Sequence, residues 1–216
     1  MSESRALVTG GTGRVGRAIV ARLEAEGFRV LGAGRADGDV SRPAEARQLV
    51  ERTVQELGGL DLLVNAAAAG FVPRQVEDVE EADWDAAFGA TAKGSFFVTQ
   101  AAAPHLKKSE LGLVVVIEDV AAYQPWPSFA PHCAAKAAQA MLTRVFARAL
   151  APEVRVCGIA PGPVAVEPTQ VERRAAETLL GRIGSPEDVA AAVVYLAGAD
   201  FVTGTTLVVD GGRLLT

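Results

Sequence analysis

A glycine-rich segment near the N-terminus has the residue types and the spacing of a turn that can bind the phosphates of a ligand. Gly11-Thr12-Gly13-Arg14-Val15-Gly16 carries glycine at its first, third and sixth positions. It follows the apolar residues 6–8 and precedes a stretch in which Val15, Ile19 and Leu23 recur every four residues, as in a helix. In this strand–turn–helix order, glycines let the backbone approach a pyrophosphate, and the helix N-terminus supplies amide donors. The segment predicts dinucleotide binding; a turn that only packs helix on strand is the alternative.

The residue at the end of the second expected strand indicates which nicotinamide cofactor binds. An Asp or Glu there holds the ribose 2′-hydroxyl of NAD(H), whereas an Arg accommodates the 2′-phosphate of NADP(H). The sequence reads Gly34-Arg35-Ala36 at this point, and its nearest carboxylates, Asp37 and Asp39, come later. Arg35 therefore favours NADP(H), with NAD(H) as the second candidate. An ordinary solvated surface arginine is the alternative interpretation.

Apolar strand patterns and helical patterns alternate along the whole chain. Strands are expected near residues 6–8, 28–33, 60–65, 113–117, 154–159 and 206–209, and helices near 14–26, 43–57, 80–108, 130–150 and 186–198. This alternation implies a parallel sheet with helices on both faces. We expect an α/β fold, a Rossmann-type doubly wound sheet in a single domain over residues 1–216. Ligands then bind beyond the carboxyl ends of the strands.

Composition excludes several classes of function. The 216 residues are 50% hydrophobic and 22% charged, which is typical of a folded domain. The net charge of −5, without a basic cluster, argues against nucleic acid, and no apolar run reaches the ~18 residues of a membrane span. The two cysteines read as reduced thiols, and no signal peptide is visible, so we expect a cytoplasmic protein. No His, Cys and carboxylate cluster has metal-ligand spacing.

Several motifs together resemble the short-chain dehydrogenase/reductase family from end to end. Thr9-Gly10 with Gly13 and Gly16 looks like its cofactor turn, in the TGxxGxxG spacing of the family's longer members. The same residues match the TGxxxRxG variant that is typical of pteridine reductases. Residues 61–68 resemble the DxLVNNAG strand, with Ala in place of its second Asn and its Gly, and residues 182–189 and 203–212 resemble the C-terminal signatures.

The resemblance implies further cofactor contacts. Asp39 of the Asp39-Val40 pair is the family residue that meets the adenine ring, and Pro161-Gly162 lies beside the nicotinamide. The candidate cofactor-binding residues are Gly10, Thr12, Gly13, Arg14, Val15, Gly16, Arg35, Asp39, Val40, Asn65, Ala66, Ala67, Lys136, Pro161, Gly162 and Val164.

One segment departs from the family pattern. The family places a helix and a strand between its second strand and the Asp-Val pair. Here Ala36, Asp37 and Gly38 alone separate Arg35 from Asp39, and three residues cannot hold a helix. We therefore expect the sheet to be shortened at this edge to about six strands, with a vestigial bridge near Asp39 as the alternative.

The resemblance also identifies four catalytic positions, of which three carry unusual residues. Lys136 matches the Lys that lowers the pKa of the family's Tyr and holds the nicotinamide ribose. His132 stands in place of that Tyr, Asp119 in place of Ser and Thr91 in place of Asn. Asp in place of Ser is a pteridine-reductase feature, whereas we know of no branch with His in place of Tyr.

The replaced residues could still transfer a proton. His132 and Lys136 share a helix face, with Asp119 opposite at a strand end. A carboxylate favours imidazolium, a nearby ammonium disfavours it, and imidazolium is a competent general acid near neutral pH. Two alternatives stay open: Lys136 only holds ribose in a protein that binds cofactor without fast turnover, or the proton comes from another group such as Tyr123.

The sequence also offers an aromatic segment for substrate. Tyr123, Trp126 and Phe129 lie where the family lines its substrate pocket, and a flat substrate could stack there; packing of a lid loop with Pro125 and Pro127 is the alternative. We predict an NADP(H)-dependent oxidoreductase that transfers hydride to or from a small carbonyl or C=N (pterin-like) substrate. The alternative function is a non-catalytic dinucleotide-binding protein, a sensor or partner subunit. The Ala- and Gly-rich helices over 80–108 and 130–150, which the family pairs across a dimer axis, imply a homodimer or homotetramer.

Overall fold

Strands and helices alternate in the computed structural model, which describes residues 4–70, 72–164 and 167–216. The strands are β1 (Arg5–Thr9), β2 (Arg29–Ala33), β3 (Leu62–Asn65), β4 (Leu113–Ile117), β5 (Arg155–Pro161) and β6 (Thr206–Val209). The α-helices are α1 (Arg14–Ala25), α2 (Pro43–Leu57), α3 (Glu81–Phe88), α4 (Gly94–Leu106), α5 (Ala130–Leu150), α6 (Val171–Ala176) and α7 (Pro186–Gly198).

The strands form one parallel sheet in the order β2-β1-β3-β4-β5-β6. This confirms the doubly wound fold and the six-stranded, shortened sheet. After the edge strand β2, one short 3-10 turn (Arg35–Asp37) leads almost directly into α2. In the described part of the chain the one isolated bridge joins Val164 to Gly184, so the alternative of a bridge near Asp39 is wrong.

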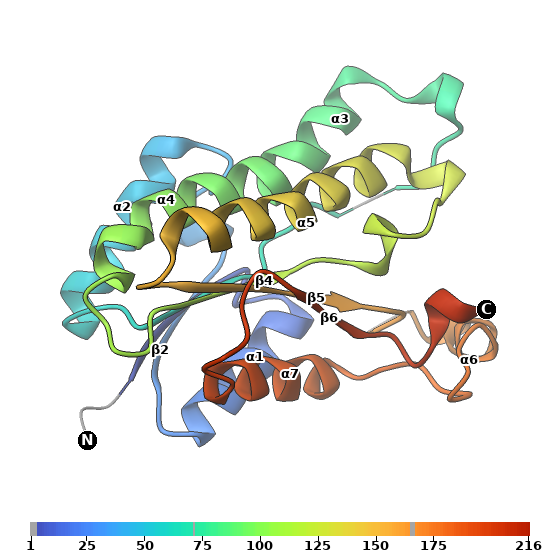
Figure 1. The fold of residues 1–216 in the computed structure, drawn as a ribbon. Helices are drawn as coiled ribbons and strands as arrows, with labels where there is room; N and C mark the ends of the chain where they lie inside the picture. The colour runs from blue at the N-terminus through green and yellow to red at the C-terminus, as the bar shows by residue number, and fades with distance from the viewer. Residues whose placement is uncertain (1–3, 71, 165–166) are drawn as a thin grey trace.

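The helices lie in two layers, one on each face of the sheet (Figure 1). α2, α4 and α5 cover one face, and α1 and α7 pack together on the other. Alternate strand residues supply the two buried cores: Val8, Val64 and Val115 face α1 and α7, whereas Leu7, Leu63 and Val114 face the other layer. Because both faces are covered, the interior residues of the strands are mostly apolar, as is typical of parallel sheets.

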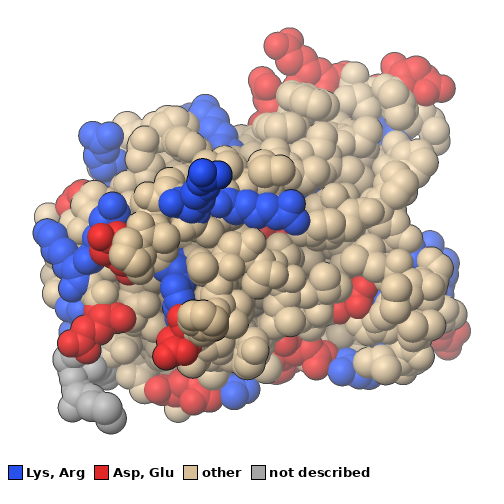
Figure 2. All heavy atoms as spheres, viewed as in Figure 1, with Lys and Arg blue, Asp and Glu red and all other residues tan. Residues whose placement is uncertain are grey.

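Charged side chains are distributed over the surface between these elements. On the face drawn in Figure 2, Lys and Arg are interspersed with Asp and Glu, and acidic side chains gather near α3. None of the helices in the described ranges combines the length and apolar composition that a membrane crossing needs.

The helix expected over residues 80–108 is instead two α-helices joined by a π-helical turn, Gly89–Lys93. Two glycines bring this turn against the segment after β2. A Cβ on Gly94 would lie 2.8 Å from Val40 Cγ2, and one on Gly89 would lie 3.3 Å from Ser41 Cβ. Periodicity could not reveal the turn, because a single wider turn barely alters the spacing of apolar residues.

Candidate functional site

The glycine-rich turn connects β1 to α1 and is too tightly packed for larger residues. Gly10 has a φ of +69°, and a Cβ on it would lie 2.6 Å from the carbonyl oxygen of Ala66. A Cβ on Gly16 would overlap the carbonyl oxygen of Gly10. Gly13 is the N-cap of α1, so the amides of the first helical turn, which have no partner inside a helix, begin here. The turn therefore has the geometry that lets a backbone bind phosphate.

A cleft of about 1240 Å³ opens at the carboxyl ends of the strands and extends from this turn. The sequence-predicted residues that line it are Gly10, Thr12, Gly13, Arg14, Val15, Gly16, Arg35, Asp39, Val40, Ala66, Ala67, Asp119, Trp126, Phe129, His132, Lys136, Pro161, Gly162 and Val164. Segments more than 150 residues apart in the chain thus meet in one concave site.

The structure does not bring three of the expected residues to the cleft. Asn65 turns into the core, where its side-chain amide donates to Thr99 Oγ1 over 2.9 Å. Thr91 is 2% exposed within the π turn, and its neighbours Gly89 and Ala90 line the cleft instead. The hydroxyl of Tyr123 lies 3.0 Å from Glu118 Oε2 and 3.2 Å from Thr206 Oγ1, outside the cleft lining.

At the β2 end of the cleft, Arg35 and Asp39 form an ion pair. Nη2 of Arg35 lies 3.3 Å from Asp39 Oδ2, and the arginine side chain is 88% exposed. Oδ1 of Asp39 accepts hydrogen bonds from the hydroxyl and the amide of Ser41, at 2.7 and 3.0 Å. These bonds, and then Arg35, hold the pKa of Asp39 below its usual value. The guanidinium is anchored on one side and open to solvent on the other.

Asp119 and His132 meet across the cleft wall, as the sequence predicts. Asp119 caps the 3-10 turn Val120–Ala122: its Oδ1 accepts from the amide of Ala121 over 2.8 Å. Its Oδ2 lies 3.3 Å from Nε2 of His132. The ring of Trp126 lies nearly parallel to the imidazole, at 11° with centroids 6.5 Å apart. His132 is therefore oriented by a fixed carboxylate and is only 6% exposed.

Lys136 lies one helical turn beyond His132 and is fully engaged by protein acceptors. Its Nζ donates to the carbonyl oxygens of Ile117 (2.8 Å) and Glu118 (3.2 Å) and to Oε1 of Gln139 (3.0 Å). An ammonium has three N–H groups, so these bonds use all of them. Burial lowers the pKa of Lys136 to about 8, against the opposing effect of Asp119 and Glu118.

Two buried polar residues at the site, Glu118 and Gln139, were missed by sequence reasoning. Glu118 is 2% exposed, and its carboxylate accepts from the hydroxyls of Thr143 (2.7 Å), Tyr123 (3.0 Å) and Thr206 (3.0 Å). Gln139 links Lys136 to Ser95 Oγ, to which its amide donates over 2.7 Å. The sequence does mark both positions: Glu118 directly follows an apolar strand, and Gln139 is a polar residue on an alanine-rich helix.

Three arginines that follow β5 and β6 add positive charge to the cleft, and sequence reasoning missed them as well. Arg173 and Arg174 of α6, and Arg213 near the C-terminus, line the cleft. The stretch over residues 163–180 showed no readable pattern in the sequence, although its Arg-Arg pair was the available signal. Within that stretch, residues 165 and 166 lie outside the described residues.

Known proteins of similar sequence and structure match this chain over nearly its whole length. The family model described as "Enoyl-(Acyl carrier protein) reductase" matches residues 12–213. The human protein "Dehydrogenase/reductase SDR family member 4" is 33% identical, over 98% of this chain and 88% of its own length. A 3-ketoacyl-(acyl-carrier-protein) reductase from Brucella melitensis, solved with NADH, superposes with a TM-score of 0.92 at 26% identity over 98% of both chains. A short-chain type dehydrogenase/reductase from Mycobacterium marinum superposes with a TM-score of 0.91 at 26% identity, over 98% of this chain and 96% of its own.

Proposed function

Because this chain belongs to the short-chain dehydrogenase/reductase family, we propose that it is an NADP(H)-dependent oxidoreductase that uses His132 as its proton donor and acceptor. The substrate is a small carbonyl or C=N compound of the pterin-like class. The observation that carries the proposal is the pair formed by Asp119 and His132, 3.3 Å apart on the wall of the cleft and one helical turn from Lys136.

The cleft fits a dinucleotide. Glycines that admit no Cβ form the phosphate-binding turn, and the exposed guanidinium of Arg35 lies where a 2′-phosphate is expected. The related Brucella reductase was solved with NADH, which supports a nicotinamide cofactor at this place. When bound, the cofactor supplies or accepts a hydride at its nicotinamide ring. The remaining work, done by this chain's own residues, is to position the substrate and move one proton.

His132 carries that proton. During reduction the substrate carbon receives the hydride, and its oxygen or nitrogen takes a proton from the imidazolium, which becomes neutral. Asp119 stabilises the charged ring and fixes its direction, because its other oxygen is held by the amide of Ala121. Oxidation follows the reverse path, with neutral imidazole as the base.

Lys136 contributes positive charge beneath the site and, in this proposal, a contact to the cofactor ribose. Since its three N–H groups are all donated, a ribose hydroxyl enters by replacing one acceptor. Two of those acceptors are backbone carbonyls of the β4 end, which are fixed. Oε1 of Gln139 is the one side-chain acceptor among the three, so we infer that this is the bond that the ribose hydroxyl replaces.

A screen of NADPH oxidation against carbonyls, quinones and pterins tests the proposal. We expect saturable turnover with at least one of these classes and release of one NADP⁺ for each substrate reduced. Turnover that persists unchanged in His132→Phe would overturn the assignment of His132. Failure of every class, despite tight NADPH binding, would overturn the enzyme proposal.

A second function, cofactor binding without turnover, is favoured by one observation. The three N–H groups of Lys136 are donated to protein acceptors, and Thr91 lies outside the cleft lining, so two of the four expected catalytic side chains are engaged by the protein or lie outside the cleft. This alternative predicts micromolar or tighter NADPH binding, no substrate that turns over well, and no kinetic consequence of His132→Phe.

A further inference from the structure

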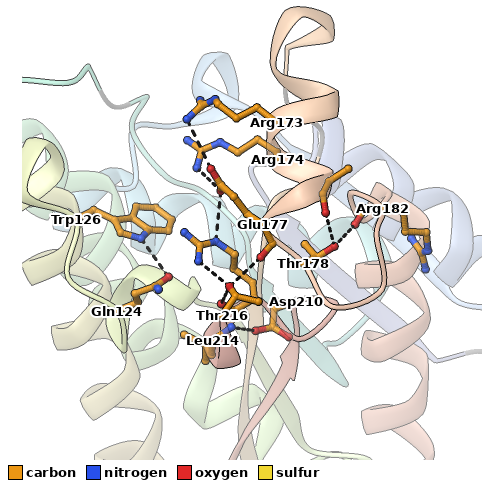
Figure 3. Close-up of polar contacts among 12 residues, drawn as sticks. Gln124, Trp126, Arg173, Arg174, Glu177, Thr178, Arg182, Asp210, Leu214 and Thr216 are labelled. Atoms are coloured by element: carbon orange, nitrogen blue, oxygen red, sulfur yellow. Dashed lines mark hydrogen bonds and ion pairs between the residues drawn. The ribbon is translucent and has the colours of Figure 1, made fainter.

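Three arginines converge on one carboxylate beside the cleft. Glu177 Oε2 lies 3.0 Å from Nη1 of Arg174 and 3.4 Å from Nε of Arg213, and its Oε1 lies 3.6 Å from Nη1 of Arg173. Figure 3 shows the guanidinium groups of Arg173 and Arg174 turned toward Glu177. Two of the positive charges therefore have no counterpart within this cluster.

The surplus charge faces the cleft. All three arginines line it, whereas neither Glu172 of α6 nor Glu177 is among the described residues that do. The carboxylate of Glu177 thus holds the guanidinium groups from behind. Arg174 and Arg213 are mostly buried, with 26% and 16% of their side chains exposed, so they are not freely solvated surface residues.

The cluster is fixed by the C-terminal turn. Asp210 accepts from the amides of Gly212 and Leu214, each over 2.8 Å. Arg213 Nη1 lies 3.1 Å from Thr216 Oγ1, and that hydroxyl lies 2.9 Å from the carbonyl oxygen of Glu177. The guanidinium groups of Arg174 and Arg213 are therefore held before any ligand arrives, which lowers the entropy lost on binding, whereas the side chain of Arg173 is 62% exposed.

The three arginines come from other segments of the chain than the phosphate-binding turn. Arg14, within the glycine-rich segment, has its own partner in Glu167 at 3.3 Å, so that pair adds no net charge. The three arginines follow β5 and β6, beyond Pro161-Gly162, the residues that the family resemblance places beside the nicotinamide. Because the glycine-rich turn and the N-terminus of α1 already provide a site for the pyrophosphate, we assign an anion bound at the arginines to the substrate.

We propose that Arg173, Arg174 and Arg213 form a subsite for an anionic group of the substrate, a carboxylate or a phosphate. The proposal rests on the proposed oxidoreductase function and deepens it: the substrate is a carbonyl compound that also carries a negative charge. Trp126, drawn in the same view, lines the same cleft and could stack on a flat body between the carbonyl and the anion (Figure 3). Guanidinium groups suit both anions because their planar N–H groups bind two oxygens at once.

Matched substrates test the subsite. The probes are 4-formylbenzoate, the neutral 4-formylbenzamide of nearly the same shape, and 4-formylphenyl phosphate. We expect kcat/KM for the charged aldehydes to exceed that for the amide by at least about tenfold, the value of one charge-assisted hydrogen bond of about 1.4 kcal/mol. The ratio between benzoate and phosphate identifies which anion the subsite prefers.

Variants separate this role from a structural one. Arg174→Met removes most of the preference for charged aldehydes and Arg174→Lys retains part of it, and in both variants the amide's kcat/KM and the NADPH affinity change far less than the kcat/KM of the charged aldehydes. The matched control is Arg22→Met, which removes an arginine of an Arg–Glu pair at the far end of α1. Equal losses for charged and neutral aldehydes, or weaker NADPH binding with the preference intact, would overturn the subsite.

A binding measurement keeps the test independent of turnover. Benzene-1,4-dicarboxylate has no reducible carbonyl, and calorimetry of its binding to the protein with NADP⁺ needs no catalysis. We expect at least about tenfold weaker binding to Arg174→Met than to the parent protein. If no aldehyde is reduced but the dicarboxylate binds through Arg174, the oxidoreductase proposal fails and the subsite stands. If aldehydes are reduced without charge preference and the dicarboxylate does not bind, the subsite fails alone.

Discussion

The hydroxyl of Tyr123, a residue outside the cleft lining, donates a 3.0 Å hydrogen bond to the carboxylate of Glu118. Burial, the largest effect, and the negative charge of Glu118 raise the pKa of Tyr123, which makes it a weaker proton donor than a tyrosine with the ordinary pKa. The tyrosine nearest in sequence to the catalytic positions therefore neither lines the cleft nor has a favourable acidity, whereas His132 lines it.

A pair of substitutions separates the two candidate proton donors. His132→Phe should lower kcat by roughly 10²–10⁴, the usual contribution of a general acid, and leave the NADPH affinity nearly unchanged. Tyr123→Phe is the matched control and should change kcat by less than about threefold. Steady-state kinetics and calorimetric titration with NADPH measure both effects. A large loss in Tyr123→Phe with an active His132→Phe variant would reverse the assignment.

Asp119 should matter for turnover because it holds the imidazole of His132 in place. Its Oδ2 lies 3.3 Å from His132 Nε2, and its Oδ1 accepts from the amide of Ala121 over 2.8 Å. Asp119→Asn should therefore lower kcat for reduction, by less than the roughly 10²–10⁴ expected for loss of the general acid itself, and leave the NADPH affinity nearly unchanged. The exposed residue Asp200 provides the control, because Asp200→Asn should leave kcat unchanged. Full activity in Asp119→Asn would mean that Asp119 does not orient the imidazole for proton transfer.

The sequence predicted those parts of the fold in which the residue types of a segment directly reflect how deeply that segment is buried. Strands covered on both faces must be apolar, and the run Leu113–Ile117 is fully buried. The glycine-rich turn was equally readable, because Gly10 and Gly16 meet backbone atoms that exclude any Cβ. The shortened edge followed from the comparison with the family pattern, since the three residues between Arg35 and Asp39 cannot hold the helix and strand that the family places there.

The side-chain directions at the site were less predictable. The sequence predicted that Asp119 and His132 lie close together, because the end of β4 fixes the position of Asp119 and one face of α5 fixes that of His132. It did not show that the 3-10 turn after Asp119 carries Tyr123 away from the cleft, or that the π turn buries Thr91. The acceptors of Lys136 depend on the backbone of β4, and the arginine cluster depends on the distant C-terminal turn. Neither contact leaves a periodic signal.

Cofactor preference can be tested at Arg35. A charge-assisted bond to a 2′-phosphate contributes roughly 1.5–3 kcal/mol, so NADPH should bind at least about tenfold tighter than NADH. Arg35→Ala should erase most of this difference and leave NADH affinity nearly unchanged. Calorimetry with both cofactors measures the effect, and Arg22→Ala, near the end of α1, is a control because Arg22 pairs with Glu26 at the same helix end. Equal affinities for the two cofactors in the parent protein would contradict the preference.

Assembly can be tested at the outer face of α5. Met141 and Val145 are 55% and 49% exposed on this helix, and Trp84 of α3 is 46% exposed. Isologous pairing of two such faces would bury these side chains, so we expect a homodimer or homotetramer. Light scattering at micromolar concentration should show a species of at least twice 22.4 kDa. Met141→Glu should shift the population toward monomer; a parent protein that is already monomeric would rule out the assembly.

Lys136 gives stability an unusual dependence on pH. Burial lowers its pKa from 10.5 to about 8, so between these values the unfolded chain holds a proton that the folded chain has lost. The free energy of unfolding contributed by this group therefore rises with pH across that window, by roughly 3 kcal/mol at about 1.4 kcal/mol per pKa unit. The variant Lys136→Met lacks the group and should lack this rise.

The comparison requires urea unfolding of both proteins at intervals between pH 7 and 10. The free energy of unfolding of the parent, minus that of Lys136→Met, should increase steadily above about pH 8. Other groups that titrate in this range cancel in the difference. Lys108→Met removes an exposed lysine after α4 and should give a difference that does not change with pH. A flat or falling difference for Lys136→Met would mean that the buried ammonium is solvated well enough to keep its ordinary pKa.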